Sequence, residues 1–215
     1  MIKAVIFDVD GLLLDSEPIW SLADRELLKR RGIDYHDELK TKIVGKGQVE
    51  SAQNVKDYYR LPDPIDDLVR ERRKLLNDLL KANLWLMPGA KELIDLLVKN
   101  NFRLAIASSQ SKEIIDLTIK SFALEGKFSV IVYGDEVEHG KPGPDIFILA
   151  AERLATRPEE ALVLEDSQNG AIAAKKAGMK VIVVPNQYNR GQEFTHAALV
   201  VERLADITPD VIEKL

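Results

Sequence analysis

The sequence predicts an α/β fold in which a parallel sheet carries helices on both faces and an all-helical domain is inserted after the first strand. Three observations predict it. Short apolar runs rich in branched residues recur along the chain, helical patterns lie between the later runs, and a long helical stretch separates the first run from the second. Strand–helix alternation of this kind gives right-handed crossovers and a parallel, Rossmann-like sheet.

The expected strands are short runs that are apolar along their whole length. This composition is typical of strands buried on both faces of a parallel sheet. The five runs are Ile2–Phe7, Phe102–Ala107, Val130–Tyr133, Ala161–Leu164 and Val181–Val184.

Three helices are expected between the later strands, because apolar residues recur there at helical spacing. The last of them ends at Gly178, a residue type that commonly terminates helices. The apolar positions are Ile114, Leu117 and Phe122, then Ile146, Leu149 and Leu154, and finally Ile172, Ala173 and Ala177.

The interval between the first two strands is far longer than the roughly 30 residues of a strand–helix–strand unit. Its apolar residues also follow a helical period, with Trp20, Ala23, Leu27 and Leu28 on one helix and a leucine-rich face on another at 66–81. The charged run within 66–76 is interpreted as the solvated face of that helix. We therefore expect an all-helical cap domain at 15–84 and a discontinuous core domain at 1–14 and 85–215.

Composition narrows the class of protein. The 215 residues are 46% hydrophobic and 30% charged, as in ordinary globular proteins. A net charge of −5 argues against nucleic-acid binding. No apolar stretch reaches the roughly 20 residues of a membrane span, and the absence of cysteine excludes disulfides and thiolate chemistry. We expect a cytoplasmic monomer that binds neither membranes nor nucleic acid.

The first strand ends in two carboxylates, Asp8 and Asp10. Residues two apart in a strand point the same way, and the carboxyl end of a parallel sheet is where ligands bind. Asp10 and Gly11 are also explained by a simple turn. Asp8 is harder to explain in that way, because a carboxylate after an apolar strand is costly to bury without a cation.

Two later strand ends carry groups that suit a phosphate. Ser108 and Ser109 precede an expected helix at 111–122, whose N-terminus favours an anion. Either serine alone is equally well explained as a helix cap. Lys141 lies between a glycine and a proline, which restrict the backbone around one long cation that is able to neutralise both Asp8 and a phosphate.

A second acidic pair, Glu165 and Asp166, follows the fourth expected strand. Helix capping explains Asp166 or Ser167, but it does not explain Glu165 as well. Two acidic pairs at one sheet edge repel each other unless a cation lies between them, and hard oxygen ligands suit Mg²⁺. The combination favours a magnesium site.

The segments "FDVDG", "ASS", "GKPGPD" and "LEDSQNG", in this order at successive strand ends, resemble the four motifs of the haloacid dehalogenase-like hydrolase superfamily. The chain is most similar to its β-phosphoglucomutase-like branch of sugar-phosphate phosphatases, and the resemblance covers essentially the whole chain. It implies hydrolysis of a small phosphorylated metabolite, with the helical insertion acting as a cap.

The resemblance also implies residue roles. Asp8 would attack phosphorus and become an aspartyl phosphate, while Asp10 would act as general acid and base. Lys141 would orient Asp8. The phosphate would be bound by Ser108, the amide of Ser109, Gly11 and Lys141. Mg²⁺ would be held by the Asp8 and Asp166 carboxylates and the Asp10 carbonyl, with Glu165 as a ligand or an outer-shell partner.

Specificity is expected from the cap, where the resemblance implies that Glu17 and the loop 45–50, including Gly45, Lys46 and Gln48, face the substrate. True β-phosphoglucomutases carry a histidine where this chain has Trp20, and an arginine that has no counterpart near Val49 and Glu50. A phosphatase is therefore favoured over a hexose-phosphate mutase. A non-enzymatic phospho-receiver module is a third interpretation, against which the long helical insertion counts.

Overall fold

The computed structural model describes residues 1–43 and 46–215. The chain divides into two compact units, Met1–Asp15 with Trp85–Leu215, and Ser16–Leu84. The first division lies after residue 15, one residue later than the sequence-based boundary. Within the described residues, no helix is both long and apolar enough to cross a bilayer.

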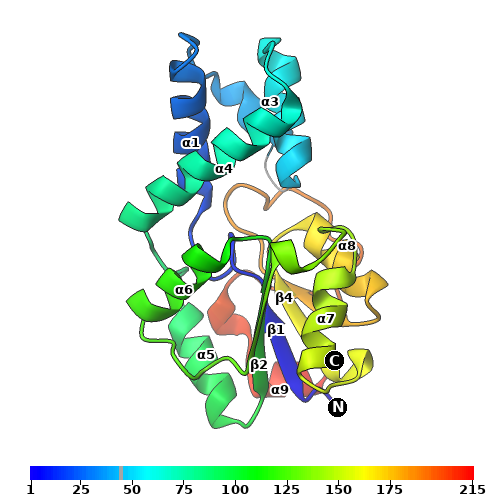
Figure 1. The fold of residues 1–215 in the computed structure, drawn as a ribbon. Helices are drawn as coiled ribbons and strands as arrows, with labels where there is room; N and C mark the ends of the chain where they lie inside the picture. The colour runs from blue at the N-terminus through cyan, green and yellow to red at the C-terminus, as the bar shows by residue number, and fades with distance from the viewer. Residues whose placement is uncertain (44–45) are drawn as a thin grey trace. The chain divides into compact units, whose positions relative to one another are not determined.

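The larger unit contains one sheet of six strands in the order β3-β2-β1-β4-β5-β6, and all of its strand pairs are parallel (Figure 1). The α/β prediction is thereby confirmed, and all five expected strands are present within one or two residues. The strands are β1 (Ala4–Phe7), β2 (Arg103–Ser108), β3 (Val130–Tyr133), β4 (Ala161–Glu165), β5 (Lys180–Val183) and β6 (Leu199–Val200). β6 was not predicted, although 197–201 is an unbroken apolar run.

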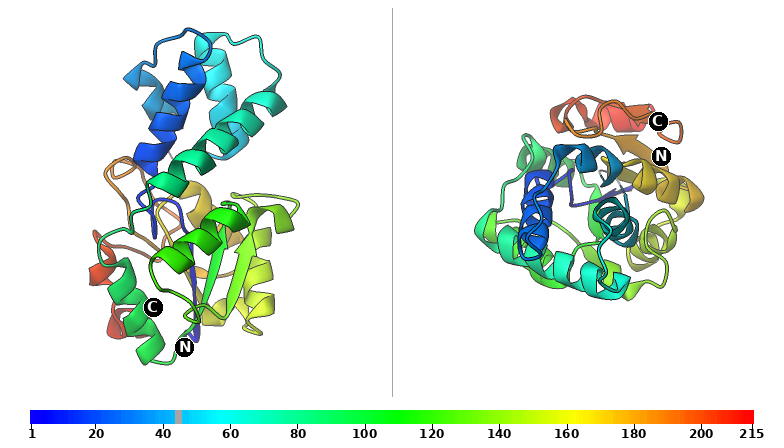
Figure 2. Two further views of the ribbon diagram at one scale, coloured as in Figure 1. Left: turned by 60° about the vertical axis from the view of Figure 1, so that its left-hand side comes forward. Right: turned by 90° about the horizontal axis from the view of Figure 1, so that it is seen from above.

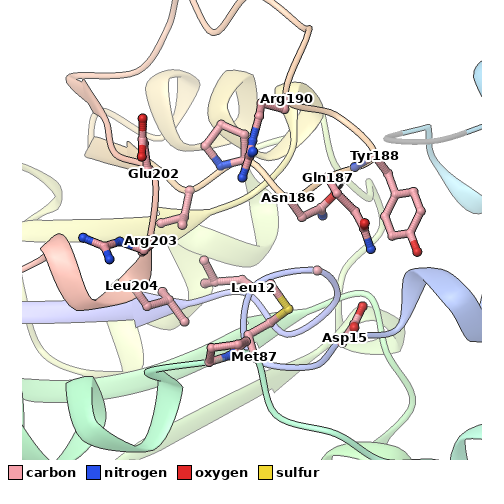
Figure 3. Close-up of a pocket in the computed structure, with 14 residues that line it drawn as sticks. Leu12, Asp15, Met87, Asn186, Gln187, Tyr188, Arg190, Glu202, Arg203 and Leu204 are labelled. Atoms are coloured by element: carbon pink, nitrogen blue, oxygen red, sulfur yellow. Dashed lines mark hydrogen bonds between the residues drawn. The ribbon is translucent and has the colours of Figure 1, made fainter.

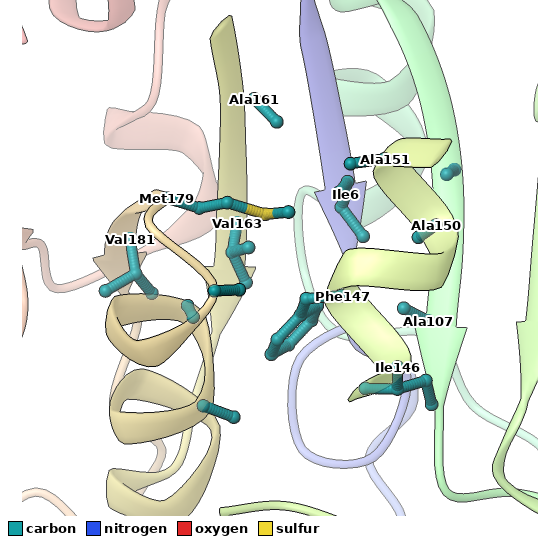
Figure 4. Close-up of a cluster of buried hydrophobic side chains, with 14 of the residues drawn as sticks. Ile6, Ala107, Ile146, Phe147, Ala150, Ala151, Ala161, Val163, Met179 and Val181 are labelled. Carbon is teal, nitrogen blue, oxygen red and sulfur yellow. The ribbon is translucent and has the colours of Figure 1, made fainter. Parts of the chain in front are cut away.

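Helices cover both faces of this sheet, with α7 and α8 on one face and α5 and α6 on the other (Figures 1 and 2). The alternation of side chains along a strand separates the two cores. On the first face, Ile6 and Val163 pack with Phe147 and Met179 (Figure 4). The helices of this unit are α5 (Ala90–Lys99), α6 (Lys112–Ser121), α7 (Asp145–Arg153), α8 (Gln168–Lys176) and α9 (Pro209–Glu213).

The smaller unit is built from helices, with α1 and α4 packed on each other and α3 packed on α4. On α1 the buried residues include Ile19, Ala23, Leu27 and Leu28, whereas the expected Trp20 is only partly buried. The apolar face of this helix is therefore rotated slightly from the predicted one. The helices are α1 (Glu17–Lys29), α2 (Lys40–Ile43), α3 (Gln48–Tyr59) and α4 (Ile65–Ala82).

The interpretation of the charged run on α4 as a solvated face is wrong for Arg72. This side chain is buried and pairs with the buried Asp24 of α1 through Nε–Oδ1 and Nη2–Oδ2 contacts of 2.5 and 2.9 Å. Its guanidinium group also lies 4.5 Å from the centre of the Trp20 ring. The physical reason is that a buried arginine needs a carboxylate, and this one comes from a residue 48 positions away.

Candidate active site

The strand order changes direction between β1 and β4, and open parallel sheets bind ligands at such a point, outside the carboxyl ends of the strands. Phe7 pairs with Ile106 on one side and Leu164 on the other. The next residues along the two central strands, Asp8 and Glu165, are therefore level with each other. Sheet register alone brings the first strand end beside the second acidic pair.

Lys141 links these two carboxylates. Its Nζ lies 2.6 Å from Oδ1 of Asp8 and 2.7 Å from Oε1 of Glu165, and it also reaches the carbonyl oxygen of Ala107 at 3.4 Å. Only 9% of its side chain is exposed. The ammonium group lies 4.7 Å from the centre of the Phe147 ring, where its positive charge is attracted to the ring face. Lys141 is thus a buried bridging cation and not a solvated loop residue.

Burial and neighbouring charges shift the pKa values of Asp8 and Lys141. Burial raises the pKa of Asp8 to about 7, against the opposing effect of Lys141 and with smaller contributions from the charges of Glu165 and Asp10. For Lys141, burial lowers the pKa, but the two carboxylates more than offset it and hold the pKa above its usual value. Lys141 is therefore charged at neutral pH.

Glu165 joins the end of β4 to the start of α8. Its Oε2 accepts hydrogen bonds from the amide of Asp166 at 2.9 Å and from the amide and hydroxyl of Ser167 at 2.8 Å each. A Cβ on Gly170 would lie 1.8 Å from Oε1 of Glu165, so the first turn of α8 needs a glycine here. The N-cap of α8 is Ser167, whose hydroxyl accepts from the Gly170 amide. The capping alternative therefore applies to Ser167 and not to Asp166.

Asp166 is held by two buried asparagines that were not among the predicted site residues. Asn186 and Asn189 both donate to its Oδ2, at 2.9 and 3.1 Å. They belong to the loop after β5, where Asn186 follows Val184 and Pro185. Polar residues after a buried strand were the signal used at four other strand ends, and the same signal was present at this one.

Asp8, Glu165 and Asp166 form a buried acidic cluster in which one carboxylate oxygen of each residue lies within 4.8 Å of the others. Lys141 pairs with two of these carboxylates, those of Asp8 and Glu165. Three hard oxygen donors close together suit a divalent cation. The chemistry of this donor set therefore fits a divalent metal ion.

The first strand end also contacts the end of β2. The amide nitrogen of Gln110 donates a hydrogen bond to Oγ of the fully buried Ser108 at 3.2 Å, and Gln110 Nε2 donates to Oδ1 of Asp10 at 2.9 Å. Ser109 is partly exposed, and the N-cap of α6 is Ser111. Neither of the two predicted serines is that N-cap, so the capping alternative does not account for them. Gln110 was not a predicted site residue.

The expected specificity residues lie in the helical unit. Glu17 is the first residue of α1. Gln48 begins α3, and Lys46 just before it pairs with Glu50 at 2.9 Å, so the expected loop is helical from residue 48 onwards. Gly47 is the N-cap of α3, so the loop ends there and not at Glu50. Gly45 lies outside the described residues.

A pocket of about 230 Å³ lies in the larger unit beside the loop that follows β1. Leu12 and Met87 line one side, while Asn186, Tyr188 and Arg190 of the loop after β5 line another (Figure 3). Asn186 therefore lies between this pocket and the acidic cluster.

A family model described as haloacid dehalogenase-like hydrolase matches residues 5–184. A probable pseudouridine-5'-phosphatase of Drosophila melanogaster is 36% identical over 211 residues, which cover 95% of this chain and 91% of that protein. A phosphorylated carbohydrates phosphatase of Thermotoga maritima is 32% identical, with coverage of 98% and 100%.

Among solved structures, CbbY from Rhodobacter sphaeroides in complex with phosphate is 33% identical, with a TM-score of 0.80 and 96% coverage of both chains. A mutant of the same protein has been solved with xylulose-(1,5)bisphosphate, at 32% identity and the same TM-score and coverage. The two relatives and the two CbbY structures each match at least 95% of this chain.

Proposed function

The chain belongs to the haloacid dehalogenase-like hydrolases, and we propose that it is a Mg²⁺-dependent phosphatase that releases phosphate from small phosphorylated metabolites, sugar phosphates in particular. The observation that carries the proposal is the buried Lys141 held between Asp8 and Glu165 in an acidic cluster at the switch point of the sheet. Relatives named as phosphatases of pseudouridine 5'-phosphate and of phosphorylated carbohydrates support this substrate class.

The proposed reaction has two displacement steps, which together divide one difficult hydrolysis into two easier reactions. In the first, a carboxylate oxygen of Asp8 bonds to phosphorus while the ester bond breaks, and Asp10 gives its proton to the leaving oxygen. In the second, Asp10 takes a proton from water, and the water oxygen attacks phosphorus and releases Asp8 and inorganic phosphate. The hydrogen bond from Gln110 supports this role because it fixes the Asp10 carboxyl.

Charge neutralisation is the main task of the remaining residues, because phosphoryl transfer depends mostly on positioning and electrostatics. Lys141 orients Asp8 and offsets its negative charge. We propose that Ser108, the amide of Ser109 and Gly11 bind the phosphoryl oxygens. The Asp8 and Asp166 carboxylates and the Asp10 carbonyl would hold Mg²⁺, with Glu165 as a ligand or an outer-shell partner. The ion would supply positive charge that lets two anions approach each other.

The test is release of inorganic phosphate from a panel of sugar phosphates and nucleotides by the purified protein with Mg²⁺. We expect Asp8→Asn to lose at least about a thousandfold in kcat, because the nucleophile is removed. The same change at the exposed Asp34 is the matched control and should leave activity unaltered. Full activity of Asp8→Asn, or full activity of the unaltered protein in EDTA, would contradict the mechanism.

Two further outcomes distinguish the alternatives. ³¹P NMR separates released phosphate from an isomerised sugar phosphate, so accumulation of the isomer without phosphate release would indicate a mutase. The absence of an arginine near Val49 and Glu50 favours the phosphatase. A stable aspartyl phosphate with no turnover would indicate a receiver module.

We also propose that residues 15–84 act as a specificity cap. Lys46→Ala should change KM for sugar phosphates while leaving hydrolysis of 4-nitrophenyl phosphate intact, because a specificity residue recognises the part of the substrate beyond the phosphate. An equal change for both substrates would argue against this role.

A further inference from the structure

We propose that Asn186 and Asn189 are positioning residues that fix the Asp166 carboxylate for the divalent cation, so that the loop after β5 is a fifth segment of the active site. This inference rests on the cation site of the proposed function. It concerns neither the nucleophile nor the phosphate-binding groups, and it is tested by metal binding in the absence of substrate.

The contacts converge on one oxygen. Asn186 Nδ2 donates to Oδ2 of Asp166 at 2.9 Å, and Asn189 Nδ2 donates to the same oxygen at 3.1 Å and to the Asp166 backbone carbonyl at 2.8 Å. All three side chains are buried, with exposed fractions of 6% for Asp166, 8% for Asn186 and 3% for Asn189. The donors thus hold both the side chain and the main chain of Asp166.

Backbone amides of the same loop fix the two side-chain amides. Asn189 Oδ1 accepts the amide of Asn186 at 2.8 Å, and Asn186 Oδ1 accepts the amide of Tyr188 at 2.9 Å. Each side-chain amide therefore has its oxygen bonded to the loop and its nitrogen aimed at Asp166. Because the oxygen and nitrogen of each amide both have fixed partners, rotation of either amide would break hydrogen bonds on both sides.

The loop after β1 packs closely against the Asp166 carboxylate and the Asn186 side chain. Gly11 has a φ of +73°, and a Cβ there would lie 2.3 Å from Asp166 Oδ2 and 2.9 Å from Asn186 Nδ2. The backbone after β1 therefore packs directly on the bonded oxygen, and any side chain at this position would displace it. Three strand ends, those of β1, β4 and β5, meet at one carboxylate oxygen.

Such contacts matter for metal binding because residues that hydrogen-bond a ligand orient it and tune its affinity. Removing a partner of this kind typically weakens metal binding by about 10- to 100-fold. Two neutral amides donate to Asp166, whereas Lys141 bridges Asp8 and Glu165. Neutral amide donors hold the Asp166 carboxylate in place without adding a charge to the site.

The experiment measures Mg²⁺ binding to the full chain by isothermal titration calorimetry without substrate. Asn186→Ala removes one donor and leaves Asn189 in place. Asn189→Ala removes the second donor, and Asn100→Ala is the matched control, since Asn100 donates its side-chain amide to the Leu96 carbonyl at the opposite end of the sheet. Urea unfolding in EDTA shows whether each variant is folded.

We expect Asn186→Ala to remain folded and to bind Mg²⁺ about tenfold or more weakly, with Asn100→Ala unchanged. Raising the Mg²⁺ concentration by the same factor as the dissociation constant should restore kcat for phosphate release, since the catalytic groups are intact. The Mg²⁺ affinity of the double variant should fall by a factor smaller than the product of the two single-variant factors, because both donors share Oδ2.

A folded Asn186→Ala with a Mg²⁺ dissociation constant within twofold of the unaltered protein would overturn the inference while leaving the proposed function standing. A purely structural role predicts that result, with lowered stability only. If Asn189→Ala does not fold, Asn186→Ala alone decides the question. If the unaltered protein itself binds no Mg²⁺, both the cation site and this inference fail.

Discussion

Replacing Asp8 by asparagine should stabilise the metal-free protein, although it removes the proposed nucleophile. Burial raises the pKa of Asp8 from 3.8 to about 7. The folded protein therefore holds the Asp8 proton more tightly than the unfolded chain does, so this group lowers stability progressively as pH rises from about 4 to about 7. Asparagine resembles the neutral carboxyl in shape and carries no charge at any pH.

The size of the effect follows from the two pKa values. Each pKa unit corresponds to about 1.4 kcal/mol, so the interval from 3.8 to about 7 gives up to about 4 kcal/mol at pH 8. At pH 5 the carboxyl is still protonated in the folded protein but mostly ionised in the unfolded chain. The stability advantage of Asp8→Asn over the unaltered protein then falls to about 2 kcal/mol. Lys141 keeps Glu165 as a partner in the variant.

The assay is urea unfolding of both proteins in EDTA at pH 5, 6, 7 and 8. We expect the free-energy advantage of Asp8→Asn to grow with pH and to level off above about pH 7. Added Mg²⁺ should reduce or reverse it, because the cation binds the ionised carboxylate. The exposed Asp34→Asn should differ from the unaltered protein by no more than about 0.5 kcal/mol at each pH. An advantage that does not vary with pH, or a less stable Asp8→Asn at pH 8, would refute the reasoning.

Three other substitutions test individual contacts. Lys141→Met breaks two buried ion pairs and should cost about 3–5 kcal/mol in EDTA, measured by urea unfolding and partly recovered by Mg²⁺. Gln110→Ala removes one hydrogen bond from the Asp10 carboxyl and should lower kcat/KM about tenfold for sugar phosphates but little for 4-nitrophenyl phosphate, whose leaving group needs no proton; equal losses would argue against this role. Arg72→Met leaves Asp24 unpaired and should cost about 3–5 kcal/mol, which Asp24→Leu in the same chain should largely restore.

Much of the core was predictable because burial on both faces of a parallel sheet requires uninterrupted apolar runs, and these are visible in the sequence. The places where such runs stop then located Asp8, Ser108 and Glu165 at one edge. Lys141 was found through the glycine and proline around it, although its burial and its two partners were not visible. β6, which has only two residues, was not predicted, although the sequence around it is apolar.

The residues that escaped prediction are polar groups whose partners lie far away in sequence. Gln110 bonds to a residue 100 positions earlier, Asn186 to one 20 positions earlier, and Arg72 to one 48 positions earlier. Asn186 does follow a buried strand, but for all three residues the sequence does not show which distant group the side chain contacts. Their roles depend on distances that no local pattern contains.

The sequence by itself determined the first five strands, the helices between the later ones and the carboxylates, serines and lysine that follow the strands, because local apolar periodicity and its interruptions encode them. Only the tertiary structure decided which of these charges pair. It placed Lys141 between Asp8 and Glu165 and surrounded Asp166 with two amides. The physical reason is that pairing and burial follow from strand register and loop packing, which join segments that are distant along the chain.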